Sequence, residues 1–85
     1  VEVLSVDENI VSAIIYPNPV SEKLNIFAEG MTNVSVFNVV GQRIMDVDVD
    51  ADNFSLDVSS LMNGIYMLKV SSVKGDFTRR ISVNK

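Results

Sequence analysis

Aspartates at every second position of residues 46–52, "DVDVDAD", are the side chains most able to bind a metal ion. Their spacing imitates the start of a calcium-binding loop, and Asp57 follows where such a loop carries its bidentate carboxylate. However, Ala51 occupies the place of the glycine that the loop needs, and the intervening valines fit a half-buried strand better. We therefore expect solvent-facing aspartates that discourage edge-to-edge pairing, with a weak surface calcium site as the alternative.

Two residue types that carry much of enzyme chemistry are missing, because the chain contains no histidine and no cysteine. Their absence removes the commonest general base at neutral pH, the thiolate nucleophile and the usual structural zinc sites. The sequence also lacks a serine elbow, an SxxK motif and a glycine-rich phosphate loop. We expect no enzymatic activity, no cofactor and no metal.

Length and composition indicate one small folded domain. The chain has 85 residues, of which 47% are hydrophobic and 21% are charged. No apolar run approaches the roughly 18 residues that a membrane span needs. The first residues do not resemble a signal peptide, so we expect any export signal to lie upstream or to have been removed.

Charge is distributed unevenly along the chain. Residues 1–68 carry ten acidic and two basic side chains, whereas residues 69–85 carry five basic and one acidic side chain. The basic residues at the C-terminal end either keep the last hairpin solvated or dock an acidic partner. The formal net charge of −4 disfavours nucleic acid as a partner, because an acidic domain repels a phosphate backbone.

Alternating apolar residues predict about seven short strands, with turns at Gly41, Asn63-Gly64 and Lys74-Gly75. This pattern favours an all-β fold, an immunoglobulin-like antiparallel β-sandwich, with a small closed barrel as the alternative. The expected core positions are Leu24, Val36, Leu56, Tyr66, Leu68 and Ile81.

Two local motifs refine this fold prediction. Tyr66 follows Gly64 at the start of a late strand, which is the place of the tyrosine whose hydroxyl bonds back to upstream backbone in immunoglobulin-like sandwiches. The opening motif Pro17, Asn18 and Pro19 predicts a stiff, extended segment that cannot donate normally to a central sheet. We expect this segment to be a boundary or an edge.

The chain resembles a known family, the type A C-terminal sorting domains of the type IX secretion system in Bacteroidetes. The resemblance runs from Tyr16 onward through "YPNPVSEKLNI", "VSVFNVVGQRI", "LDVSSLMNGIYMLKV" and a closing basic strand that ends at Lys85. Each motif alone is weak, but four in this order and spacing are fairly specific. One departure is Gln42, where the family often has lysine after the glycine.

The resemblance implies a β-sandwich at the C-terminus of a larger secreted protein. Such a precursor reaches the periplasm through an N-terminal signal peptide, and the tail then addresses it to the outer-membrane translocon. In many members a surface sortase removes the tail and attaches the cargo to lipopolysaccharide or releases it. The expected location is therefore the periplasm in transit, then the cell surface or the medium. In this chain, residues 1–12 would be a linker or a loosely added first strand, and residues 13–85 the sorting domain.

The implied recognition region is the C-terminal part of the chain. A folded surface or an exposed late strand would contact the translocon, with basic side chains that set orientation. The expected partner-recognition residues are Gly64, Tyr66, Lys69, Lys74, Gly75, Arg79, Arg80 and Lys85. An edge-strand dimer is a further expectation.

Two other classes of protein remain alternatives at this point. An adhesion or carbohydrate-binding module would have the same strands and an exposed aromatic platform. A structural linker domain within a larger enzyme would be followed by more chain, and we expect the chain to end at Lys85.

Overall fold

The computed structural model describes residues 13–85, which form five antiparallel strands and no helix. The strands are β1 (Ala13–Tyr16), β2 (Lys23–Phe37), β3 (Arg43–Asp57), β4 (Gly64–Ser72) and β5 (Gly75–Val83). They belong to one sheet, in which β1, β2, β4 and β5 lie in that order and β3 also pairs with β2. The expected all-β antiparallel fold is confirmed. The prediction that residues 1–12 form a linker or first strand lies outside the described residues.

The predicted number of strands was wrong, because residues 23–37 and 43–57 form two long, bent strands in place of shorter ones. β2 and β3 each run for 15 residues. β2 continues through Gly30 with a positive φ of 68° and shifts its register against β3 between Phe27 and Met31. The acidic stretch around Asp52 likewise continues in β3, where the Asp52 carboxylate accepts a hydrogen bond of 2.9 Å from the Gly30 N–H. Residues 13–85 therefore form five strands where about seven were expected for the chain.

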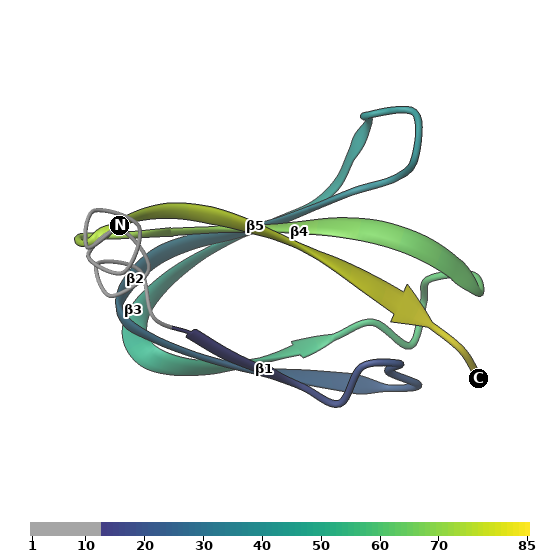
Figure 1. Cartoon of the computed structure of the whole chain (residues 1–85), viewed down its shortest axis with the longest axis horizontal. Helices are drawn as coiled ribbons and strands as arrows, with labels where there is room; N and C mark the ends of the chain where they lie inside the picture. Colours follow the sequence, from purple (N-terminus) through teal and green to yellow (C-terminus); the bar gives the residue numbers. More distant parts are fainter. Residues whose placement is uncertain (1–12) are drawn as a thin grey trace, which may run out of the picture.

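The two long strands curl the sheet so that its two halves face each other (Figure 1). The first half of β2 pairs with β1 and with the second half of β3. The second half of β2 pairs with β4 and with the first half of β3, and β5 lies beyond β4. The described residues form one sheet, so the expected separation into the two sheets of a sandwich is not seen.

The hydrophobic core fills the space between these two halves. Alternation along each strand sends every second side chain inward, where burial of apolar surface stabilises the fold. All expected core positions except Tyr66, which is half-buried, are almost completely buried. The core consists of Val20, Leu24, Ile26, Ala28, Met31, Val34, Val36, Leu56, Val58, Leu68, Val70, Ile81 and Val83.

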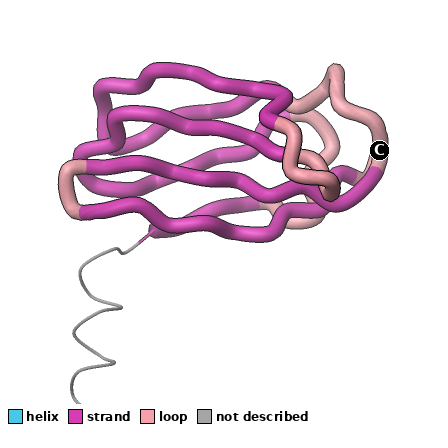
Figure 2. The backbone as a smooth tube through the Cα atoms, turned by 90° about the horizontal axis from the view of Figure 1, so that it is seen from above, coloured by secondary structure: helices cyan, strands magenta, loops and turns pink. Residues whose placement is uncertain are grey.

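Most of the loops gather at one end of the sheet, together with the C-terminal end of the chain (Figure 2). The turn between β4 and β5 lies at the opposite end (Figure 1). No helix in residues 13–85 is long and apolar enough to cross a membrane.

Candidate functional site

The outer face of the β4–β5 hairpin carries two of the predicted recognition residues. Lys69 lies opposite Thr78, and Met67 lies opposite Arg80. Leu68, between Lys69 and Met67, points into the core and has no exposed surface. Because successive strand residues point to opposite faces, Lys69 and Arg80 project together on the side away from the core.

On this outer face, a row of side chains crosses the sheet from strand to strand. The side chains are apolar at the centre of the row and basic at its two ends. Phe37 of β2 lies opposite Met67 on one side and opposite Arg43 on the other, so the row runs from Arg43 to Arg80. Met67 and its neighbour along the strand face, Ile65, are exposed at 37% and 42%. An apolar centre with a polar rim is the composition of many protein–protein interfaces. We did not anticipate this row from the charges alone, although alternation along each strand carries the signal for it.

The remaining basic residues of the hairpin take different positions. Arg79 lies on the opposite face from Arg80, with its guanidinium carbon 5.4 Å from the centroid of the Phe77 ring, a cation–π arrangement. Lys74, in the turn before Gly75, forms an ion pair of 3.3 Å with Glu29. Lys69 lies 4.0 Å from the Asp76 carboxylate. The structure therefore separates the basic cluster expected from the sequence into two faces and a turn.

Two other predicted recognition residues, Tyr66 and Lys85, hold the loop that precedes β4, and a third, Gly64, begins that strand. The Tyr66 hydroxyl donates a hydrogen bond of 2.6 Å to the Met62 carbonyl, which confirms the predicted bond to upstream backbone. The Lys85 ammonium donates to the carbonyls of Ser59 and Leu61. Gly64 lies opposite Val83 at the start of β4. These contacts give Tyr66 and Lys85 a role in fixing the loop and the end of β5.

The opening motif lies against the same strand, β5. The Asn18 side chain accepts a hydrogen bond of 3.0 Å from the Ser82 N–H and donates one of 3.2 Å to the Arg80 carbonyl. Val20 then forms a parallel bridge with Val83. The motif thus covers the last part of the β5 edge. The expected extended conformation was wrong, because the chain bends at Asn18 and Pro19, and this bend lets the Asn18 side chain reach β5.

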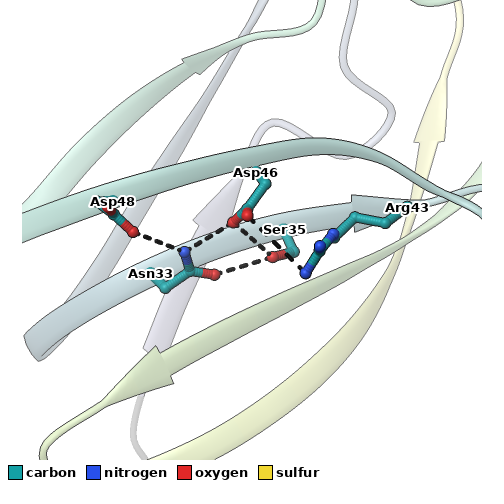
Figure 3. A network of polar contacts seen from close by, with 5 residues as sticks. All are labelled: Asn33, Ser35, Arg43, Asp46 and Asp48. Atoms are coloured by element: carbon teal, nitrogen blue, oxygen red, sulfur yellow. Dashed lines mark hydrogen bonds and ion pairs between the residues drawn. The ribbon is translucent and has the colours of Figure 1, made fainter.

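The aspartates of β3 are exposed, and Figure 3 shows the hydrogen bonds that engage Asp46 and Asp48. The Asn33 amide donates to Asp46 at 2.7 Å and to Asp48 at 3.1 Å, and the Ser35 hydroxyl donates to Asp46 at 3.2 Å. Arg43 lies 3.8 Å from the Asp46 carboxylate. Within residues 13–85 no group of three or more acidic, histidine or cysteine side chains could hold a metal ion. The expectation of solvent-facing strand aspartates is confirmed.

Two exposed carboxylates have lowered pKa values. The hydrogen bond from Asn33 lowers the pKa of Asp46 most, with help from Ser35 and Arg43 and against a smaller effect of desolvation. The hydroxyl and N–H of Ser59, at 2.6 and 2.9 Å, lower the pKa of Asp57 in the same way. A lowered folded pKa stabilises the protein above the pKa of an unfolded aspartate, about 3.9. This stabilisation is lost as the pH falls through the lower folded pKa.

We therefore predict that the double variant Asp46→Asn, Asp57→Asn loses part of the acid dependence of stability. Its free energy of unfolding should fall less between pH 5 and pH 2, roughly the titration range of paired carboxylates, than that of the parent chain. Urea unfolding at a series of pH values measures this slope. Asp50→Asn is the control, because no residue of the described part donates a hydrogen bond to the Asp50 side chain. Equal slopes for the parent and the double variant would contradict the prediction.

A family model described as "Secretion system C-terminal sorting domain" matches residues 14–84, which is nearly every residue of the five strands. The chain belongs to this sorting-domain family. The resemblance inferred from the four motifs is confirmed. Membership indicates a C-terminal sorting signal for type IX secretion, interaction with that machinery, and export to the cell surface or the extracellular space.

A curated relative supports this assignment. Beta-agarase D of Zobellia galactanivorans is 32% identical to the sorting domain over 66 residues. The alignment covers 78% of this chain but only 13% of the agarase, so the similarity concerns a small part of that larger protein.

Proposed function

We propose that the sorting domain directs a larger cargo protein through the type IX system across the outer membrane, after transit through the periplasm. The match of the sorting-domain family over residues 14–84 carries this proposal. The domain acts as an address rather than a catalyst. A surface sortase then removes the tail and anchors or releases the cargo, as the family resemblance implies.

The translocon contacts the outer face of β4 and β5. Exposed apolar area at Ile65 and Met67 supplies the burial that stabilises a protein–protein contact. Arg80 and Lys69 supply positive charge beside it, which orients an acidic partner and raises the rate of encounter. The carboxylates of β3 lie on the same side of the sheet and would repel an acidic partner from β3. An acidic partner is therefore favoured over β4 and β5.

We predict that charge reversal on this face lowers export. Arg80→Glu in a reporter that carries residues 1–85 at its C-terminus should reduce the secreted fraction by about tenfold or more, because like charges across an interface cost several kcal/mol. The assay measures reporter fluorescence in the medium, on the surface and in the periplasm of a Bacteroidetes host. Arg80 is exposed, so its replacement should change stability by only about 0.5 kcal/mol.

The matched control for this prediction is Lys23→Glu, the same reversal at an exposed basic residue at the start of β2, in the other half of the sheet. Export of that variant should equal that of the parent reporter. Full export of a folded Arg80→Glu reporter would show that the translocon does not recognise the charge at this position.

A second candidate function, a carbohydrate-binding or adhesion module, is favoured by one observation. Tyr16 and Phe27 are exposed at 47% and 42% and lie with their rings parallel within 5°, their centroids 6.0 Å apart. Both project from the outer face of the half of the sheet that contains β1. Such a flat aromatic surface fits the apolar face of a sugar ring. The family match makes sorting the better supported function.

A further inference from the structure

The first half of β5 has a free backbone edge. Ser72 and Gly75 face each other across the two-residue turn between β4 and β5. This pairing determines which residues of β5 turn their backbone N–H and C=O groups toward β4. The contacts of Asn18 and Val20 with Arg80 and Ser82 show that even-numbered residues of β5 turn their backbone groups away from β4. Asp76 and Thr78 therefore present their N–H and C=O groups to the open side. Within residues 13–85, no strand covers them.

The opening motif sets where this free edge ends. Asn18 occupies the Arg80 carbonyl and the Ser82 N–H, and Val20 accepts from the Asn84 N–H and donates to the Ser82 carbonyl. The open stretch is thus residues 76–79, together with the N–H of Arg80. A hollow of about 260 Å³ lies at its end, between Asn18, Pro19, Ile65, Arg80, Ile81 and Ser82. A side chain of an added strand can enter this hollow beside Arg80.

The charges beside the free edge indicate which kind of strand can pair with it. Arg79 flanks the edge on the inner face and Arg80 on the outer face, and neither forms an ion pair with another described residue. A second copy of β5 paired antiparallel over residues 76–80 would set Arg80 of each copy opposite Asp76 of the other, so opposite charges would meet on one face only, and Arg79 would face Phe77. An extended segment with acidic side chains would instead pair with arginines on both of its faces. Charge complementarity therefore favours a partner strand of opposite charge.

We propose that an extended acidic segment of the type IX machinery adds as a strand to residues 76–80 of β5. This inference rests on the proposed sorting function and identifies the contact through which the machinery reads the domain. Backbone hydrogen bonds at Asp76, Thr78 and Arg80 provide affinity, and the two arginines provide selectivity. The bonds of Asn18 and Val20 fix where the added strand stops.

Thr78→Pro tests the proposal. Proline at this position removes the outward N–H and places its ring on the free edge, while the N–H groups that bond to β4 belong to the odd-numbered residues. Export of the Thr78→Pro reporter should fall by about tenfold or more, since the added strand loses hydrogen bonds and meets the ring. Thr78→Ala keeps the N–H and should be exported as well as the parent. Circular dichroism and thermal unfolding of both purified variants establish that they fold.

Four outcomes are informative. Loss of export in Thr78→Pro with normal export of Thr78→Ala supports strand addition. Normal export of folded Thr78→Pro, or equal loss in both variants, overturns strand addition and leaves the sorting function standing. Failure of the parent reporter to be exported instead overturns the sorting function itself.

A second measurement applies if Thr78→Pro does not fold. Amide hydrogen exchange of the isotope-labelled parent chain, followed by NMR with purified type IX translocon in detergent, reports each amide separately. Protection should rise at the amides of Asp76, Thr78 and Arg80. Unchanged exchange at these three amides in a bound complex overturns the proposal.

Discussion

Leu68→Ala should lower the free energy of unfolding by about 2–5 kcal/mol, the range for removing a large aliphatic side chain from a core. Leu68 has no exposed surface and lies in β4 between Val36 of β2 and Arg79 of β5. A domain of this size has a total stability of about 4–13 kcal/mol, so the loss is a large fraction of it. Urea unfolding followed by circular dichroism measures the change.

The control for this prediction is the next residue in the chain. Met67→Ala truncates a side chain that points outward and is 37% exposed, so it should cost about 1 kcal/mol or less. Because the two substitutions are adjacent on one strand, the difference between them isolates burial from strand propensity. Equal losses for Leu68→Ala and Met67→Ala would contradict the core described here.

Gly30→Ala should destabilise the domain by about 2–4 kcal/mol. The φ of Gly30 is 68°, a conformation that costs an alanine about 1–2 kcal/mol. An added Cβ would also overlap the Cγ2 atom of Val73, so Val73 would have to move. The Val73 N–H bonds to the Gly30 carbonyl at 2.9 Å, which limits how far this residue can withdraw. The same urea unfolding experiment applies.

Gly41→Ala separates the cost of backbone strain from the cost of steric overlap with Val73. Gly41 also has a positive φ, 91°, but apart from its chain neighbours no atom of residues 13–85 lies within 4 Å of the position of an added Cβ. Its replacement should therefore cost only the backbone strain, about 1–2 kcal/mol. If Gly30→Ala were no more harmful than Gly41→Ala, the close approach of Val73 would not restrict the bend in β2.

Alternation of apolar residues was sufficient to predict the strand content and the core. Leu24, Leu56 and Ile81 were identified as core positions from this pattern, and all three are buried. Strand continuity could not be predicted, because glycine and aspartate usually mark turns. In β2 and β3 they mark a bend, which depends on contacts between Gly30, Asp52 and Val73 that are remote in sequence.

The candidate site was predictable in composition but not in arrangement. The charge difference between the two parts of the chain identified the basic residues, and alternation alone implies that Arg79 and Arg80 face opposite ways. The role of Lys85 depends on carbonyls more than 20 residues earlier, so no local pattern indicates it. The hydrogen bonds between Asn18 and β5 join residues more than 60 positions apart, so no local sequence pattern indicates them either.

Export of a reporter that carries residues 1–85 tests the central claim most directly. The chain is joined to the C-terminus of a periplasm-directed fluorescent protein in a Bacteroidetes host, with and without a functional type IX translocon. A second reporter lacks residues 75–85 and so lacks β5. A sorting signal predicts reporter on the surface or in the medium only with the full chain and the intact translocon. A full-length, folded chain whose reporter stays in the periplasm would contradict the sorting function and favour the carbohydrate-binding module.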